Sequence, residues 1–131
     1  MLPIGKDGYM RRIETVAAPG AIGPYSQGVV AMGMVFTSGQ IPVDPETGEI
    51  PDGIEAQAER CCKNVQVILE AAGTTMERVI KTTCYLADMQ DFAAFNQVYA
   101  QYFTECPARS CVAVKQLPKN VLCEVEAIAE I

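Results

Sequence analysis

The sequence predicts one α+β domain built as a two-layer sandwich, in which a sheet of roughly six strands is covered on one face by two helices. Three observations lead to this prediction. The chain has 131 residues, which suits one domain, and half of them are hydrophobic, which is enough for a core. Two segments show helical periodicity, whereas the other apolar segments are short and bounded by turn residues. No repeat or linker divides the chain, so we treat residues 1–131 as a single domain.

Three short strands are expected before the first helix. Residues 12–16 form the first strand, and residues 26–32 and 34–38 form two more that are joined by a tight turn at Gly33. Residues 41–48 are rich in turn-forming residues, so we expect a loop there.

The first helix is the clearest pattern in the sequence. Asp52 can cap its N-terminus, and Glu55 three residues later would complete a capping box. Gly73 would end the helix in a left-handed conformation. The residues between these ends include apolar side chains at helical spacing, which must face the sheet: Ile54, Ala58, Cys61, Cys62, Val65, Leu69 and Ala72.

The second half of the chain alternates strands and a helix. A strand over residues 79–87 is followed by a helix that begins near Asp91 and ends before Pro107. One face of this helix is aromatic: Phe92, Phe95, Tyr99, Tyr102 and Phe103. Two last strands, over residues 108–116 and 121–131, complete the order β-β-β-α-β-α-β-β.

The two last strands are expected to pair with each other as a hairpin. Because side chains alternate along a strand, this pairing would set Val112 opposite Val125, with the apolar sides of both strands towards the helices. Arg109, Glu124 and Glu126 would then lie together on the far face. Such a group is either an exposed set of cross-strand ion pairs or the polar lining of a cleft where another subunit docks.

Composition narrows the classes of function. The formal net charge is −6 and the basic residues are scattered, which argues against a nucleic-acid partner. No apolar stretch approaches the ~20 residues of a membrane helix, and residues 1–10 lack the apolar segment of a signal peptide. We therefore expect a cytoplasmic protein with no nucleic-acid or membrane partner, and a flexible extension over residues 1–10.

The six cysteines are expected to be reduced thiols, because the chain carries no export signal. Cys84 and Cys123 lie within apolar strand-like segments, where a free cysteine behaves as a small hydrophobic residue. The chain has no histidine and no C-x-x-C pair, so we expect no metal site.

Several motifs follow one another along the chain. AIGPYSQG (21–28) and TSGQIP (37–42) precede the first helix, and VIKTT (79–83) follows it. PARSCV (107–112) and EVEAIA (124–129) occupy the two last strands. Together these motifs resemble the reactive intermediate deaminase family, RidA/YjgF, from about the first strand to the C-terminus.

The resemblance implies a chorismate-mutase-like fold that assembles as a homotrimer. The sheets of three subunits would close an inner barrel with the helices outside, and the active sites would lie between subunits. This assembly would make the polar sheet face the lining of a cleft, and it would cover sheet edges that otherwise invite aggregation.

The resemblance also implies which residues form the active site. Arg109 matches the arginine that holds the substrate carboxylate, a task that suits a planar guanidinium. Glu124 matches the glutamate that positions the attacking water, and Tyr25 matches the tyrosine that closes the pocket from the neighbouring subunit. The other matches bind substrate through the backbone or a polar group: Ser38, Gly39, Asn96 and Cys111.

The implied reaction is hydrolytic deamination of reactive 2-enamino and 2-imino acids, such as 2-aminoacrylate and 2-iminopropanoate, to 2-oxo acids and ammonia. It requires no metal or organic cofactor. The alternative is a non-catalytic trimeric module that binds small carboxylates as a sensor or chaperone. A ribonuclease or translation inhibitor, functions also attached to this family, suits the acidic, histidine-free chain least.

Overall fold

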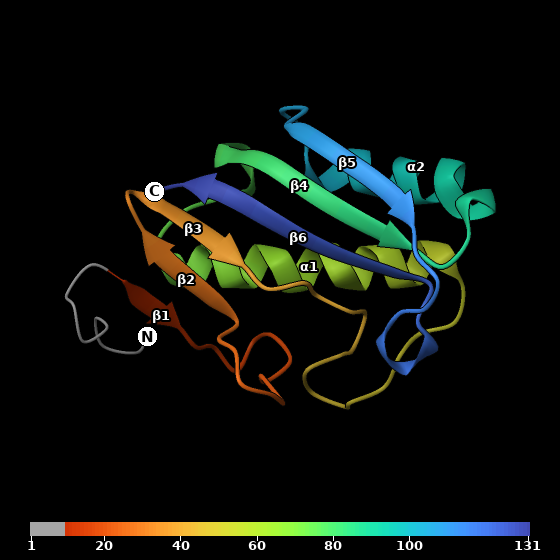
Figure 1. The fold of residues 1–131 in the computed structure, drawn as a ribbon, viewed down its shortest axis with the longest axis horizontal. Helices are drawn as coiled ribbons and strands as arrows, with labels where there is room; N and C mark the ends of the chain where they lie inside the picture. Colours follow the sequence, from red (N-terminus) through yellow and green to blue (C-terminus); the bar gives the residue numbers. More distant parts are fainter. Residues whose placement is uncertain (1–9) are drawn as a thin grey trace.

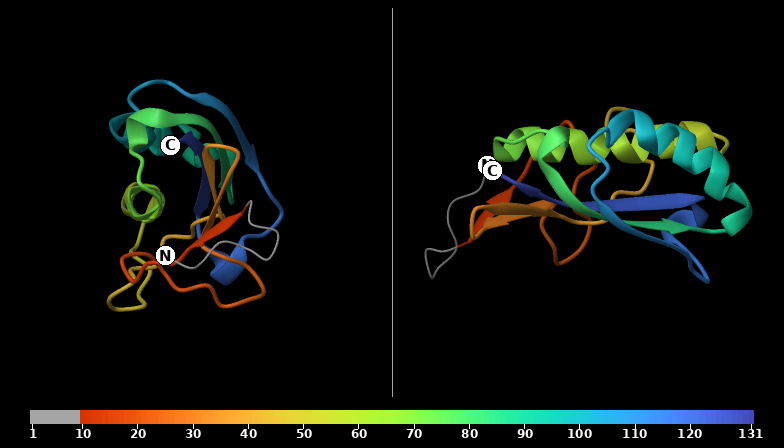
Figure 2. Two further views of the ribbon diagram at one scale, coloured as in Figure 1. Left: turned by 90° about the vertical axis from the view of Figure 1, so that its left-hand side faces the viewer. Right: turned by 90° about the horizontal axis from the view of Figure 1, so that it is seen from above.

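The computed structural model describes residues 10–131, which fold into two layers (Figure 1). Six strands form one sheet, and both helices lie on the same side of it, as the two views of Figure 2 show. The prediction of an α+β sandwich with the order β-β-β-α-β-α-β-β is confirmed. The flexible extension expected over residues 1–10 lies outside the described residues, apart from Met10.

The elements are close to the expected ones, although several strands are shorter. In chain order they are β1 (Arg11–Ile13), β2 (Gly28–Ala31), β3 (Met34–Thr37), α1 (Ile54–Ala72), β4 (Val79–Leu86), α2 (Phe92–Tyr102), β5 (Ala108–Ala113) and β6 (Cys123–Glu130). Three short 3₁₀ helices lie between them: Met76–Arg78, Met89–Asp91 and Pro118–Asn120. No helix among residues 10–131 is long and apolar enough to cross a membrane.

The strand order differs from the expected hairpin at the C-terminus. The sheet runs β1-β2-β3-β6-β4-β5, so β6 lies between β3 and β4, and β5 is an edge strand. β5 pairs in parallel with β4, and every other neighbouring pair is antiparallel. The predicted β5–β6 hairpin is therefore wrong. The physical reason is that α2 carries the chain across the sheet between β4 and β5, which is the connection that parallel strands need.

This order also corrects the predicted sheet faces. Arg109 on β5 is the register partner of Thr82 on β4, and Thr82 is fully buried beneath the helices. Partners in adjacent strands share a face, so Arg109 faces the helices. Val112 instead faces away from the helices and is 46% exposed. Glu124 and Glu126 do lie on that far face, but the predicted grouping of Arg109 with them is wrong.

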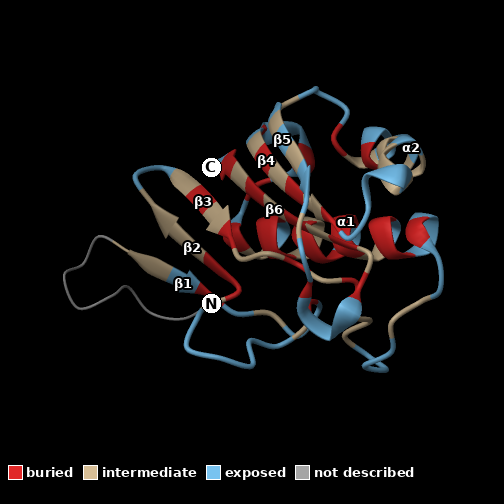
Figure 3. Cartoon of the chain, turned by 45° about the vertical axis from the view of Figure 1, so that its right-hand side comes forward, coloured by how far each residue is buried: buried red, intermediate tan, exposed pale blue. Residues whose placement is uncertain are grey.

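The core lies between α1 and the sheet, where the buried residues of Figure 3 gather. The apolar face predicted for α1 is buried along its whole length, which confirms that prediction. The tight turn at Gly33 is also confirmed, with positive φ at Met32 (55°) and Gly33 (71°), as two-residue hairpin turns require.

The two ends of α1 differ in how well the sequence predicted them. Gly73 adopts the expected left-handed conformation, with φ 93° and ψ 22°, and its N–H donates to the carbonyl of Glu70. The predicted cap by Asp52 is wrong. Gly53 occupies the N-cap position with φ 88°, and no side chain caps the helix, because the glycine turn places Asp52 outside the first turn.

Candidate active site

Four of the residues assigned to the active site by resemblance line one hollow on the sheet face away from the helices. Tyr25, Ser38, Gly39 and Glu124 surround a volume of about 460 Å³. The rest of the lining is apolar except for Thr37 and a second carboxylate: Ile22, Thr37, Ile41, Pro118 and Glu126. Tyr25 is 50% exposed, so the rim of the hollow is accessible from outside the chain.

The segment that follows β3 is held in the hollow by hydrogen bonds. The backbone N–H of Ser38 donates to the carbonyl of Gln27 at 2.9 Å, and its hydroxyl donates to the carbonyl of Ser26 at 2.6 Å. Gln40 and Val125 exchange two backbone hydrogen bonds, of 2.8 and 3.1 Å. The segment therefore runs antiparallel beside β6, where it meets Glu124.

Gly39 allows the carboxyl group of Glu124 to pack directly against its backbone. A Cβ atom at position 39 would lie 2.8 Å from Cδ of Glu124, and it would lie even closer to Oε2. No non-bonded carbon approaches a carboxylate so closely. A side chain at position 39 would therefore displace the carboxyl group of Glu124 from its present position, although the backbone itself is not left-handed.

Glu124 is half-buried, and its environment favours the protonated form. Burial is the main cause that raises the pKa of this carboxyl, and the nearby charge of Glu126 raises it further. The hydroxyl of Tyr85 donates to Oε1 of Glu126 at 3.0 Å. A carboxyl with a raised pKa exchanges protons closer to neutral pH, as an acid–base group in an active site must do.

Arg109 lies in a second cluster, formed with one face of α2. Its Nη1 donates to Oδ1 of Asn96 at 2.8 Å. The guanidinium carbon lies 4.7 Å from the ring centroid of Tyr99 and 5.4 Å from that of Phe92. These three helix residues are four and three positions apart, so they share one side of α2. The Tyr99 hydroxyl is itself held by a buried 2.7 Å hydrogen bond with Thr82.

The guanidinium of Arg109 retains donors for a ligand. Among the hydrogen bonds described for residues 10–131, Arg109 takes part only in the one with Asn96. Arginine has five N–H donors arranged as a planar fork. The cluster thus fixes the plane of the group and leaves donors for a carboxylate.

Cys111 follows Arg109 on the same face of β5 and is half-buried. Burial raises the pKa of its thiol, although the positive charge of Arg109 acts in the opposite direction. The pKa of Cys84, the register partner of Cys111, is raised to about 12, mainly by burial. Both side chains are therefore thiols rather than reactive thiolates. A contribution of Cys111 to binding would come from its backbone.

Within one chain the two clusters do not meet. Arg109, Asn96 and Cys111 lie on the helix side at the β5 edge, whereas Glu124 lies on the far side of the sheet, with β4 between β6 and β5. No hydrogen bond or ion pair described for residues 10–131 joins the clusters. Arg109 and Glu124 of one chain therefore face opposite sides of the sheet.

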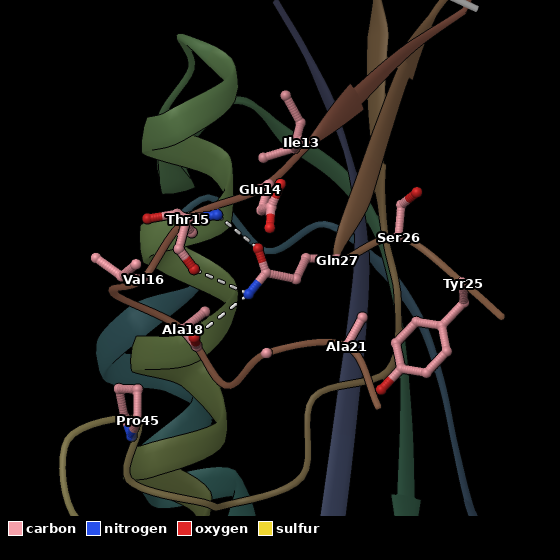
Figure 4. Close-up of a pocket in the computed structure, with 11 residues that line it drawn as sticks. Ile13, Glu14, Thr15, Val16, Ala18, Ala21, Tyr25, Ser26, Gln27 and Pro45 are labelled. Atoms are coloured by element: carbon pink, nitrogen blue, oxygen red, sulfur yellow. Dashed lines mark hydrogen bonds between the residues drawn. The ribbon is translucent and has the colours of Figure 1, made fainter. Parts of the chain in front are cut away.

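Sequence analysis missed several residues that support these clusters. Thr82 and Tyr85 belong to a strand whose alternation could have placed one on each face, had its partners been known. Gln27 is buried and fixes the segment before Tyr25 (Figure 4). Its side-chain amide accepts from the backbone N–H of Thr15 at 2.7 Å and donates to the carbonyls of Thr15, Ala18 and Pro19. A polar side chain inside the motif GPYSQG was the available signal.

The chain matches the model of one known protein family. The family model described as "Endoribonuclease L-PSP" matches residues 15–131, which is nearly the whole described chain. The chain belongs to this family. It is the family also called RidA/YjgF, so the predicted resemblance is confirmed.

Relatives within the Endoribonuclease L-PSP family carry the name of a deaminase. The 2-iminobutanoate/2-iminopropanoate deaminase of Escherichia coli (strain K12) is 51% identical over 123 residues, which covers 91% of this chain and 96% of that protein. The protein of the same name from Salmonella typhimurium has the same identity over the same length.

Solved structures of family members share the fold. The YjgF gene product of E. coli is 50% identical to this chain with a TM-score of 0.89, and the match covers 92% of this chain and 98% of that one. The crystal structure of E. coli TdcF with bound serine is 53% identical, also with a TM-score of 0.89, and has the same coverage.

Proposed function

We propose that this protein hydrolyses reactive 2-imino acids, and their 2-enamino tautomers, to 2-oxo acids and ammonia. The observation that carries the proposal is the pair of matched clusters: a guanidinium with free donors, and a half-buried carboxyl whose pKa is raised. The deaminase name of relatives that are 51% identical over more than nine-tenths of this chain supports the same reaction.

The active site is assembled between subunits of a homotrimer. Arg109, Asn96 and Cys111 of one subunit face the hollow of the next, which supplies Tyr25, Ser38, Gly39 and Glu124. The separation of the two clusters within a single chain supports this arrangement. So do the exposed apolar side chains beside them, Ile22 at 83% and Val112 at 46% exposure, which a subunit interface would cover.

Arg109 binds and orients the substrate through its carboxylate. The guanidinium fork donates two parallel hydrogen bonds to the carboxylate oxygens, which fixes the plane of the adjacent C=N carbon. The rings of Tyr99 and Phe92 hold the guanidinium in place without using its donors. The serine bound in the crystal structure of E. coli TdcF likewise has a carboxylate next to a carbon bonded to nitrogen.

Glu124 transfers the protons. As the water oxygen attacks the C=N carbon, Glu124 takes one water proton and returns it to the nitrogen, which gives a carbinolamine. Glu124 then takes the proton of the new hydroxyl and delivers it to the same nitrogen. The C–N bond breaks, the C=O bond forms, and ammonia leaves. Each cycle returns Glu124 to its starting state.

The expected location of the protein is the cytoplasm. All six cysteines are free, and Cys61 and Cys123 remain unpaired although their sulfur atoms are only 3.7 Å apart. Free thiols are typical of a reducing compartment.

The first test is the release of ammonia and 2-oxo acid from freshly generated 2-aminoacrylate, with the wild-type protein beside Arg109→Ala. The proposal predicts faster release with the wild type and the buffer rate with the variant. Glu124→Gln should still bind a small 2-oxo acid but should not accelerate release. If a folded wild-type protein binds 2-oxo acids without accelerating release, the small-carboxylate sensor replaces the deaminase.

A further inference from the structure

A second carboxylate and a phenol lie beside Glu124, and the reaction described above uses neither. Glu126 is two residues further along β6, on the same face, and it lines the same hollow. Tyr85 is the register partner of Glu124 on β4, and its hydroxyl donates to Oε1 of Glu126 at 3.0 Å. The sheet therefore gathers three oxygen-bearing side chains at one point.

We propose that Glu126 and Tyr85 are positioning residues that control how readily Glu124 takes up and returns a proton, a role that rests on the proposed deaminase function. Glu126 supplies a fixed negative charge next to Glu124. Tyr85 acts only through Glu126, because its hydrogen bond keeps that carboxylate beside Glu124 instead of extended into solvent.

The chemistry needs such control. An ordinary glutamate carboxylate is too weak a base to hold a water proton at neutral pH, and Glu124 has to do so twice in each cycle. Half-burial shifts Glu124 in the required direction, and the neighbouring carboxylate adds to the shift. Burial and the adjacent glutamates also raise the pKa of Tyr85, so its hydroxyl keeps the proton that it donates to Glu126.

Few other charged or titratable groups face Glu124. Tyr25 lines the same hollow, and Lys119 lines the adjoining one beside Gly39. Lys81 lies further along β4, opposite Ile128, and its Nζ is 3.5 Å from the hydroxyl of Ser110. Among residues 10–131 of one chain no ion pair involves Glu124 or Glu126, so Glu126 is the charge of its own chain that acts most directly on Glu124. In the proposed homotrimer Arg109 of the next subunit also faces this hollow, and its positive charge opposes the effect of Glu126.

The test is a pH titration of Glu124 in the full chain, followed by NMR of ¹³C-labelled glutamate side chains. Glu126→Gln should lower the titration midpoint of Glu124, because one adjacent like charge is lost. The acid limb of kcat/KM for imine hydrolysis should move to lower pH by the same amount. Glu130→Gln is the matched control, because it removes the same charge from an exposed site on the same strand and face; it should move neither quantity.

Tyr85→Phe separates positioning from packing, because it keeps the ring and removes only the hydroxyl. The midpoint of Glu124 should fall in this variant, by less than in Glu126→Gln. In the double variant Glu126→Gln/Tyr85→Phe it should equal that of Glu126→Gln alone. A midpoint unmoved by Glu126→Gln, or an equal effect of Tyr85→Phe with and without Glu126, would overturn the proposal.

The two proposals can fail separately. The NMR titration reports on Glu124 whether or not the protein turns over an imino acid. Wild-type protein without deaminase activity, but with the expected midpoints, would refute the proposed function and retain the coupling between the three side chains. If the protein is active but Glu126→Gln moves neither the titration midpoint of Glu124 nor the acid limb of kcat/KM, the coupling is refuted and the proposed function is retained.

Discussion

The carboxylate of Glu124 occupies the space that a side chain at position 39 would need. A Cβ there would lie 2.8 Å from Cδ of Glu124, and the backbone of Gly39 is not left-handed, so alanine can be accommodated only if Glu124 moves. If Glu124 carries protons as proposed, we expect Gly39→Ala to lower kcat/KM for imine hydrolysis by about 10- to 100-fold, the cost of displacing such a group by about 1 Å. Circular dichroism and Tm should change little. Gly20→Ala is the control, since a Cβ there meets no atom within 4 Å. Full activity of Gly39→Ala would show that Glu124 needs no fixed position.

The raised pKa of Glu124 also predicts how stability depends on pH. Burial makes the ionised carboxyl less favourable in the folded chain than in the unfolded chain, so ionisation of Glu124 costs stability. This cost is absent below the unfolded-state pKa, grows as the pH rises, and is complete above the folded-state pKa. Glutamine cannot ionise. The Tm of Glu124→Gln minus the Tm of the wild type should therefore increase as the pH rises from about 4 to about 8. Thermal unfolding at equal protein concentration measures the difference, and a difference that is constant with pH would contradict the prediction.

At the scale of elements, α2 serves as a platform for Arg109. Phe92, Asn96 and Tyr99 share one side of the helix and contact the guanidinium from two rings and an amide. Sequence analysis identified the aromatic face of this helix but assigned it no contact with Arg109. Phe95 and Phe103 of that aromatic set are buried. What could not be read from spacing is that Arg109 would reach this face from another strand.

Tyr99→Leu tests the platform. The substitution keeps an apolar side chain and removes the ring 4.7 Å from the guanidinium, an interaction that is typically worth about 0.5 to 2 kcal/mol. We expect KM for the imino acid to rise about 2- to 30-fold, as the conversion of that energy gives, with a smaller change in kcat. Tyr102→Leu is the control, because its hydroxyl bonds Glu59 on α1 at 3.1 Å instead of holding Arg109. Equal effects of both variants on KM would mean that the effect comes from helix packing and not from the contact between Tyr99 and Arg109.

Element types were predictable from sequence, but strand partners were not. The burial pattern of α1 and the left-handed Gly73 follow from local periodicity and backbone chemistry, which the sequence displays directly. Pairing of β6 between β3 and β4 depends on contacts between distant segments, and alternation along β6 is the same whichever strand lies beside it. The connection through α2 was the one local signal for a parallel β4–β5 pair. Because that signal was not used, the sequence analysis assigned Arg109 to the wrong face of the sheet.

At the scale of the whole molecule, one chain contains every candidate site residue, but these residues form two clusters on opposite faces of the sheet. Each chain carries the cluster of Arg109 and Asn96 at the β5 edge and the hollow with Glu124 beside β6. The motifs pointed to both sets of residues because a motif match depends on residue type and order in the sequence. It does not depend on which chain supplies each side chain to a site. Only the sheet order shows that Arg109 and Glu124 of one chain lie on opposite faces of the sheet.

This division predicts complementation between two inactive variants. In the proposed homotrimer Arg109→Ala would lack the carboxylate anchor and Glu124→Gln would lack the proton carrier, so each variant alone should be inactive. Mixed trimers, formed by co-expression or by unfolding and refolding the two variants together, contain interfaces where an intact Arg109 faces an intact Glu124. Random mixing in equal amounts makes about a quarter of the sites intact, so about a quarter of wild-type activity should return. Ammonia release from 2-aminoacrylate measures the recovery, and the double variant Arg109→Ala/Glu124→Gln mixed with wild type provides the reference for random assembly. Differently tagged chains that purify together would show that the mixed variants exchange subunits. If such mixtures still remain inactive, Arg109 and Glu124 do not act across a subunit boundary. The two clusters would then have to meet within one chain by a rearrangement of β5.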